Sequence, residues 1–338
     1  MPEVTVAIPT RDGGELLAGV LAALAGQSVE HELLVCDSGS RDGSLEIARS
    51  HGARVLAVAP EQFSHGGVRN RLMSAARGAH VALLTQDAEP ADERWLARML
   101  DAFSLAEDVG IAYGPYRPRA DAPTPVRLEL DAWFASLAPD SGPQIERLSE
   151  TERSLPALEL LGRRGFFTDA NACVSRAAWQ RVPFREVPYA EDRVLAMDML
   201  RAGYAKAFVP AAAVVHSHSY SATDQLGRCF DEWRGLLEVY GWREPLSPRR
   251  VLGQLCGELA RARTALDGEG AQGAQRRAAL AAVARHHLLT RAGALLGSRA
   301  DRLPAGARRR LSLERRAGFS PLEQAPMTEP RAESAAER

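Results

Sequence analysis

The segment LLTQDAEP places a carboxylate where chemistry can be expected. An apolar run from His80 ends at Gln86 and Asp87, and Pro90 then limits any continuation of the strand. Ligands of open α/β sheets bind at the carboxyl ends of the strands. A carboxylate beside a nucleotide diphosphate is a usual ligand of Mg²⁺ or Mn²⁺, since hard cations prefer oxygen. We therefore expect Asp87 to bind one of these cations.

Two further pairs of residues could belong to the same site. Glu191 and Asp192 stand at the expected start of a helix in AEDRVLAMDM, where acidic residues either act in catalysis or only favour the helix dipole. His216 and His218, in VVHSHS, are two apart on an extended segment and should face the same way. Two histidines and one carboxylate can bind zinc, but carboxylates and a diphosphate fit a hard cation better.

Two segments could bind the nucleotide itself. The second strand ends in VCDSGSRDGS, which puts Asp37 at the edge of the sheet and Ser38 in the next turn. Asp37 could accept a hydrogen bond from a base or ribose, whereas Asp42 is better explained as a helix cap. In FSHGGVRNR, two glycines and Arg69 lie near a helix start, and both features favour a diphosphate.

A parallel sheet would bring these segments together, and the first 115 residues predict one. Apolar strands separated by helical segments are expected at 4–10, 31–37, 54–60, 80–87 and 109–115. Strands this apolar indicate an α/β fold with helices on both faces of the sheet. The chain lacks G-x-G-x-x-G after its first strand and lacks G-x-x-x-x-G-K-[ST], which argues against a dinucleotide-binding fold and a P-loop NTPase.

The rest of the chain divides into three parts. Residues 116–245 begin loop-rich and then regain strands and helices, so we expect 1–245 to form one domain, with 1–115 as its nucleotide-binding half. Residues 246–319 are rich in alanine, arginine and leucine and predict a helical extension. Residues 320–338 are rich in proline, glutamate, alanine and serine and predict a disordered tail.

Charge and cysteine content suggest the surroundings of the protein. The net charge is −1, but residues 241–338 carry +8 and residues 1–240 carry −9. The arginine-rich end is either a solvated helical face or a contact with an anionic membrane, and no nucleic-acid partner is expected. Four scattered cysteines, no secretory signal and no apolar run long enough to span a bilayer predict a cytoplasmic protein.

Together these motifs resemble those of bacterial family 2 glycosyltransferases of the GT-A fold. Seven segments between Val4 and about Tyr240 carry the resemblance: VAIPTRDGG, CDSGSRDGS, FSHGGVRN, LLTQDAEP, FFTDANACVSRAAW, VPYAEDRVLAMDMLRAGY and VVHSHSYS. Within the family, FSHGGVRN, TQDA and HSHSYS are most similar to rhamnosyltransferases. The resemblance implies a Rossmann-like, mostly parallel sheet with helices on both faces, and the C-terminal helical extension lies outside it.

The resemblance also implies roles for the candidate residues. Asp87 matches the metal-binding carboxylate of a D-x-D motif whose first position is Gln86, and His216 or His218 matches a histidine near the metal or diphosphate. Asp192, which follows Glu191, matches the catalytic base. The nucleotide would contact Pro9, Thr10, Arg11, Asp37, Ser38, Arg69 and Gln86, and Asp169 and Asn171 would border the acceptor.

The implied reaction is an inverting sugar transfer that uses Mg²⁺ or Mn²⁺. The sugar would be rhamnose from dTDP-rhamnose, and the acceptor a hydroxyl group of a glycan or lipid-linked intermediate of cell-surface polysaccharide synthesis at the inner face of the cell membrane. A UDP-sugar donor is the alternative. Because the first D-x-D aspartate is missing, a non-catalytic protein that binds sugar nucleotides is a second alternative. A nucleotidyltransferase should carry a glycine-rich basic loop that PTRDGGE does not match.

Overall fold

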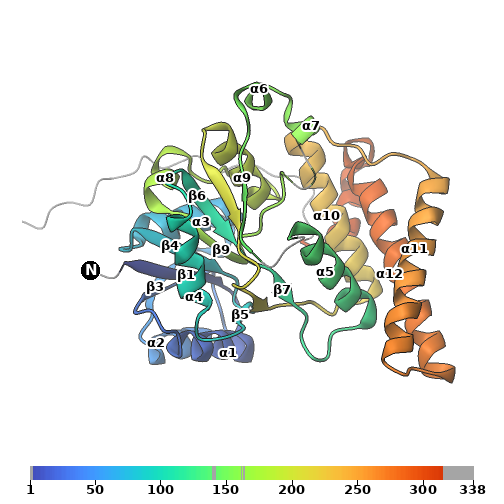
Figure 1. Ribbon diagram of the computed structural model, residues 1–338, viewed down its shortest axis with the longest axis horizontal. Helices are drawn as coiled ribbons and strands as arrows, with labels where there is room; N and C mark the ends of the chain where they lie inside the picture. Colours follow the sequence, from blue (N-terminus) through green and yellow to red (C-terminus); the bar gives the residue numbers. More distant parts are fainter. Residues whose placement is uncertain (1–2, 139–141, 161, 163, 315–338) are drawn as a thin grey trace, which may run out of the picture.

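The computed structural model describes residues 3–138, 142–160, 162 and 164–314, and an eight-stranded sheet lies at its centre (Figure 1). The strands in spatial order are β3 (Arg54–Ala57), β2 (Glu32–Asp37), β1 (Val4–Thr10), β4 (His80–Leu84), β9 (Asn171–Ser175), β6 (Val109–Tyr113), β10 (Ala205–Phe208) and β8 (Gln144–Glu146). Among these strands only β9 and β8 run against the others. The expected mostly parallel sheet is therefore confirmed, with β9 inserted between β4 and β6.

Helices cover both faces of the sheet, as the apolar strands predicted. One face carries α1 (Gly14–Ala25), α2 (Ser44–Ser50) and α4 (Trp95–Asp101). The other carries α3 (His65–Ala75), α5 (Thr124–Leu137), α8 (Arg176–Arg181) and α9 (Glu191–Arg201). In β1, Val6 and Ile8 pack into the first layer and Ala7 into the second, which explains why the strand is apolar at every one of these positions.

Shorter elements connect the larger ones. They are α6 (Glu150–Arg153), α7 (Ala157–Leu160) and the 3₁₀ helices Pro60–Gln62, Ala102–Ser104 and Ala300–Arg302. A second sheet has three two-residue strands, β5 (Glu89–Pro90), β11 (Val214–Val215) and β7 (Tyr116–Arg117), in the order β5-β11-β7. This small sheet begins directly after the QDA segment. The chain therefore leaves the main sheet before Asp87 and enters the small sheet after it.

The C-terminal helices form one side of the molecule together with α5 (Figure 1). They are α10 (Ala222–Tyr240), α11 (Pro248–Gly268), α12 (Gly273–Gly297) and α13 (Ala305–Leu311). Helix α12 packs along α10, and a Cβ at Gly297 would lie 2.3 Å from the carbonyl oxygen of Phe230, so only glycine permits this approach. Helices are present in the expected extension, which the structure describes as far as residue 314, and residues 315–319 and the tail at 320–338 lie outside the described residues.

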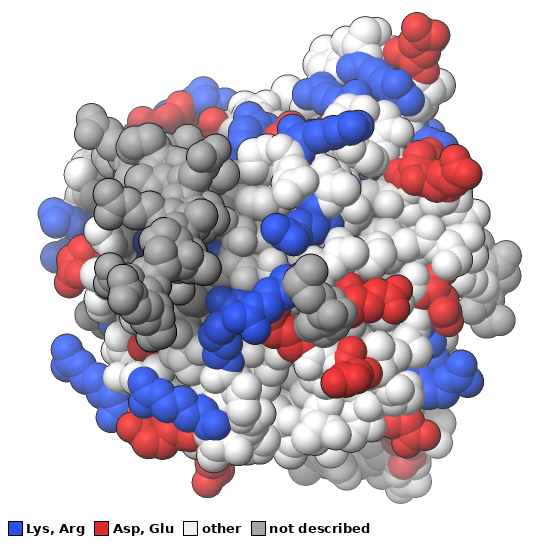
Figure 2. Space-filling model, turned by 90° about the vertical axis from the view of Figure 1, so that its left-hand side faces the viewer, with Lys and Arg blue, Asp and Glu red and all other residues white. Residues whose placement is uncertain are grey.

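Charges of both signs are mixed on the face shown in Figure 2, over the part of it that the described residues form. On this face the described acidic and basic residues lie among one another, and neither sign gathers in one large patch. Within the described ranges, none of the helices is long and apolar enough to cross a lipid bilayer.

Candidate active site

A cleft of about 1120 Å³ lies between the strand ends of the main sheet and helices α5, α10 and α12. The predicted site residues that line it are Pro9, Thr10, Arg11, Ser38, Arg69, Gln86, Asp87, Asp169, Glu191, Asp192, His216 and His218. These residues come from segments spread over more than 200 positions, and the sheet topology brings them to one place. The exceptions are Asp37 and Asn171, which the cleft does not include.

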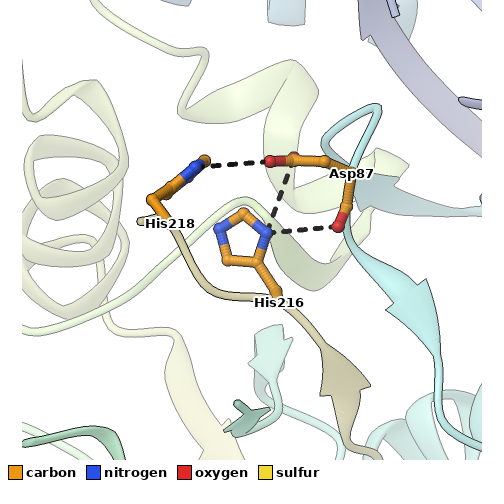
Figure 3. Close-up of side chains that lie close together, drawn as sticks. All are labelled: Asp87, His216 and His218. Carbon is orange, nitrogen blue, oxygen red and sulfur yellow. Dashed lines mark hydrogen bonds and ion pairs between the residues drawn. The ribbon is translucent and has the colours of Figure 1, made fainter. Parts of the chain in front are cut away.

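Asp87, His216 and His218 form a compact cluster (Figure 3). Nδ1 of His216 lies 3.5 Å from one carboxylate oxygen of Asp87, and Nδ1 of His218 lies 3.7 Å from the other. One ligand atom from each residue falls within 4.8 Å of the other two. This donor set fits a single divalent cation, with the remaining positions open to diphosphate oxygens or water.

The small sheet accounts for the position of this cluster. Strand β11 pairs antiparallel with β5, so that Val215 faces Glu89. Asp87 precedes β5 and His216 follows β11, and the pairing therefore sets the carboxylate beside the imidazole. The alternation of side chains along an extended segment then returns His218 to the same side.

The histidines of the cluster are neutral near pH 7. Burial lowers the pKa of His216, although the carboxylate of Asp87 opposes this. Burial and the adjacent His216 lower the pKa of His218 to about 4. A neutral imidazole keeps a lone pair, which is the form that binds a metal.

Gln86 does not point at this cluster as a ligand. Its side-chain oxygen accepts hydrogen bonds from Oγ1 of Thr10 and the backbone N–H of Arg11, both at 2.8 Å. Its amide nitrogen donates to the carbonyl oxygen of Arg11. Gln86 thus joins the ends of β1 and β4, and the candidate ligands in the described residues are Asp87 and the two histidines.

Glu191 and Asp192 open α9, directly after a strained residue. Ala190 has φ 64°, a left-handed conformation that costs a non-glycine residue energy and is common near functional sites. Burial, Asp169 and Glu191 raise the pKa of Asp192 well above its ordinary value. Burial raises the pKa of Glu191, although His65 opposes it. A carboxylate with a raised pKa is a stronger base, which suits proton abstraction.

Arg69 pairs with Asp169 beside these two carboxylates. Its Nε and Nη2 donate to the two carboxylate oxygens of Asp169 at 2.5 and 2.7 Å. Nη1 is buried and has no hydrogen-bond partner among the described residues. The pair carries no net charge, so Arg69 borders the cleft as part of a neutral pair and not as an uncompensated cation.

The glycines of FSHGGVRN do not make room for a diphosphate. A Cβ at Gly66 would lie 2.4 Å from the carbonyl oxygen of Arg185, so this glycine allows close packing of two protein segments. Ser64 caps α3 by accepting from the N–H of Gly67, and its own hydroxyl donates to Glu186. The interpretation of this helix start as a diphosphate site was wrong, because the 185–186 segment covers it.

The prediction for Asn171 was also wrong. Its oxygen accepts from Nε1 of Trp95 at 2.8 Å, and its nitrogen donates to the carbonyl oxygens of Pro115 and Ala212. The residue is fully buried and holds strands together, so it cannot border an acceptor.

Asp37 lies under the wall of the cleft. It is 4% exposed, and its carboxylate accepts from the backbone N–H groups of Gly39 and Ser40, so it orders the turn that carries Ser38. Its contact with the nucleotide stays a prediction. Oδ1 of Asp42 accepts from the N–H of Ser44, but the N-cap position of α2 is Gly43, so Asp42 orders the turn before the helix and is not its cap.

Arg228 of α10 is a cleft residue that the sequence did not single out. Its guanidinium stacks 4.7 Å from the ring centre of Tyr189, and its Nη1 is buried without a hydrogen-bond partner among the described residues. Its positive charge acts on both His216 and His218. The same Nη1 lies 3.7 Å from a carboxylate oxygen of Glu232, an ion pair between residues four apart on the helix.

Glu314, close to the end of the described chain, also lines the cleft. Its carboxylate lies 3.2 Å from Nε2 of His65, and Nδ1 of His65 lies 3.9 Å from Glu191. Asp231 of α10 fixes this segment by accepting from Oγ of Ser312 and the N–H of Glu314. No sequence motif predicted the contact between Glu314 and His65, because it depends on how the last helices pack against the rest of the protein.

Comparison with known proteins gives a consistent result. The model of the family "Glycosyl transferase family 2" matches residues 5–180. The chain is 30% identical over 239 residues to the O-antigen chain rhamnosyltransferase RfbN of Salmonella typhimurium, covering 68% of this chain and 71% of the relative. It is 28% identical over 237 residues to the O-antigen chain rhamnosyltransferase WbaN of Salmonella anatum, with the same coverage.

One solved structure extends the comparison of folds. The mannosyltransferase PcManGT from Pyrobaculum calidifontis, in complex with GDP-Man and Mn²⁺, superimposes with a TM-score of 0.57 at 18% identity. The match covers 89% of this chain and 86% of the other. At this identity the likeness concerns the GT-A-type fold alone, and it includes part of the helical C-terminal region.

Proposed function

The chain belongs to glycosyl transferase family 2 and is a glycosyltransferase, and from this premise we propose that it transfers rhamnose from dTDP-rhamnose to a hydroxyl group of a glycan or lipid-linked acceptor. The observation that carries the reaction is that one cleft is lined both by the Asp87–His216–His218 cluster and by Asp192. The similarity to two O-antigen chain rhamnosyltransferases supports the sugar. A UDP-sugar is the alternative donor.

The reaction would be a single displacement at the anomeric carbon. The acceptor oxygen forms a bond to that carbon while the bond to the diphosphate oxygen breaks, and the configuration inverts. Asp192 takes the proton of the acceptor hydroxyl, and the nucleoside diphosphate leaves with the bonding electrons. The raised pKa of Asp192 makes this carboxylate a better proton acceptor than an exposed aspartate.

Other cleft residues would bind the donor. Pro9, Thr10, Arg11, Ser38 and Gln86 lie around the ends of β1 and β4 and would contact the nucleotide. Arg69 would donate from Nη1, and Asp169 would hold its guanidinium in place. Asp87, His216 and His218 would hold Mg²⁺ or Mn²⁺, which supplies positive charge next to the leaving diphosphate.

A donor panel tests this proposal. The thermal midpoint would be measured with dTDP, UDP and GDP, each with and without Mn²⁺, and a ligand of the folded state raises it according to its affinity. Release of nucleoside diphosphate from the matching sugar nucleotides would follow, with lipid extract as the acceptor source. We expect the largest shift with dTDP, and we expect Asp192→Asn to keep the shift while it loses transfer. A shift with UDP alone would overturn rhamnose and keep the enzyme class.

We also infer that the start of α11 contacts an anionic membrane surface. Leu246 and Leu252 are 70% and 60% exposed, and Arg249 and Arg250 lie exposed between them. Exposed leucines next to arginines suit an interface with anionic lipid. Co-sedimentation with phosphatidylglycerol vesicles should exceed that with phosphatidylcholine vesicles, and Leu246→Glu with Leu252→Glu should abolish the difference. Equal sedimentation of the native protein with both vesicles would refute the contact.

A further inference from the structure

Trp133 is a large aromatic residue that lies open to the cleft. It is 37% exposed, on α5, and its ring stands edge-on to Phe166 with ring centres 4.9 Å apart. Phe166 in turn packs against Phe134, so an aromatic cluster supports the indole from behind. The indole therefore lines the cleft, is held by aromatic neighbours, and keeps part of its surface exposed.

This indole and the expected base Asp192 line the same cleft, and Phe166 connects them. The guanidinium of Arg193 sits 5.7 Å from the ring centre of Phe166, and Arg193 directly follows Asp192. Trp133 therefore contacts Phe166, and Phe166 contacts Arg193, the residue next to the expected base Asp192. The substrate that reaches Asp192 from this side is the acceptor, because the donor diphosphate belongs at the Asp87 cluster.

A carboxylate one turn away on the same helix is held in position by the C-terminal helices. Glu129 is four residues before Trp133, on the same side of α5, and 59% of its side chain is exposed. Nε2 of His286, on α12, lies 2.8 Å from Glu129. The amide of Gln225 donates to Nδ1 of His286 at 2.7 Å, so the proton of the ring is on Nε2 and points at Glu129.

We propose that Trp133, Glu129 and His286 form a subsite that binds one sugar ring of the acceptor. A pyranose has a flat C–H face and a rim of hydroxyl groups. The C–H face would stack on Trp133, while the second oxygen of Glu129 accepts a hydrogen bond from a ring hydroxyl. This inference rests on the proposed glycosyl transfer, and it gives α12 of the helical extension a part in acceptor recognition.

A lipid chain does not suit this subsite. Hydrocarbon would gain from Trp133 but would cover the half-exposed Glu129 carboxylate and leave its second oxygen without a hydrogen-bond partner. A saccharide offers a C–H face to the indole of Trp133 and hydroxyl groups to the carboxylate of Glu129.

The experiment is saturation-transfer NMR of methyl glycosides of galactose, glucose, mannose and rhamnose, with dTDP and Mg²⁺ present. Signals of dTDP report the donor site, and signals of the glycosides report the subsite in the same sample. We expect at least one glycoside to receive saturation on its C–H face. Trp133→Ala should weaken its binding about tenfold, Trp133→Phe by less than about threefold, and Glu129→Gln should change the order of preference among the sugars. Leu105→Ala, at an exposed leucine outside the cleft, is the control.

The outcomes separate the two proposals. If dTDP binds but no glycoside does, or if Trp133→Ala leaves glycoside binding intact, the subsite is refuted while the donor assignment stands. If n-decyl phosphate binds in a Trp133-dependent way and the glycosides do not, the subsite receives lipid and the inference fails. If dTDP itself does not bind, the proposed donor is wrong, whatever the glycosides show.

Discussion

Arg69 and Asp169 are 100 positions apart in sequence and form a two-pronged ion pair in the wall of the cleft. Their side chains are 5% and 9% exposed. Removal of one partner from a buried pair leaves an uncompensated charge, whereas replacement of both by apolar residues can be neutral. The pair thus links the stability of the fold to the geometry beside Asp192.

We therefore predict that Arg69→Met and Asp169→Leu each lower the free energy of unfolding by about 3–5 kcal/mol, and that the double variant regains most of it. Urea denaturation gives these values. The pair Arg147–Asp108 is the control, because it has the same two-pronged geometry at 2.7 and 2.6 Å but is 47% and 39% exposed. Arg147→Met should cost less than about 1 kcal/mol. Equal costs at both sites would contradict the prediction.

Asp87→Asn should remove the metal-dependent part of nucleotide binding. Asp87 offers both carboxylate oxygens to the cluster, and an amide is a weaker, neutral ligand for a hard cation. In this variant, Mn²⁺ should no longer raise the thermal midpoint beyond the value with dTDP alone. A chelator should have the same effect on the native protein. Asp92→Asn is the control, since Asp92 pairs with Arg98 outside the cleft. An unchanged Mn²⁺ effect in Asp87→Asn would mean that the cation binds elsewhere.

Arg228→Met should lower the affinity of the cleft for the diphosphate group of the donor. Nη1 of Arg228 has no hydrogen-bond partner among the described residues, and its charge acts on both histidines of the cluster. We expect kcat to fall by roughly 10²-fold and dTDP to bind more weakly, while the affinity for thymidine stays unchanged. Isothermal titration of both ligands measures this. Arg147→Met is the control, because Arg147 pairs with Asp108 outside the cleft. An equal loss for thymidine would indicate general damage to the cleft.

The sequence predicted those parts of the site that depend on strand order. Apolar strands indicate a parallel sheet, and a parallel sheet collects strand ends at one edge, so the places of Asp87 and Ser38 at that edge follow from the strand pattern alone. The paired histidines also followed from the alternation of an extended segment. What the sequence did not show was which side chains are already used by the protein itself, as Asn171 is by Trp95.

The contribution of the C-terminal helices could not be predicted either. The periodicity of a helix shows which of its faces is apolar but not which element it packs against. His286 and Glu314 reach the cleft only because α12 packs on α10 and because Asp231 holds the segment at Ser312. These are tertiary contacts between residues far apart in sequence, and no local pattern encodes them.

The rate of transfer should depend on pH through Asp192. A base must be deprotonated, and burial, Asp169 and Glu191 raise its pKa, while Arg193 opposes this. kcat/KM should therefore fall with decreasing pH at values well above the ordinary aspartate pKa of about 4. Glu191→Gln removes a neighbouring negative charge, so the fall in kcat/KM should then occur at lower pH. If kcat/KM falls at the same pH in Glu191→Gln as in the native protein, the group that titrates is not Asp192.

Glu314→Gln should lower the pKa of His65. Burial alone would lower this pKa, but the carboxylates of Glu191 and Glu314 outweigh burial and raise it. A histidine with a raised pKa in the folded state adds stability below its unfolded pKa of about 6.5, and this is lost as the pH rises through the folded value. Glu314→Gln should thus destabilise the protein more at pH 6 than at pH 9. Imidazole titration by NMR and urea denaturation at both pH values measure the two effects.

The matched control for this variant is Glu269→Gln. Glu269 pairs with Arg127 at 2.5 Å on the surface, and arginine keeps its charge over the whole range. Its substitution should therefore cost the same small amount at pH 6 and at pH 9. If Glu314→Gln behaves in the same pH-independent way, His65 is not charged beside Glu314, and this ion pair does not hold the segment.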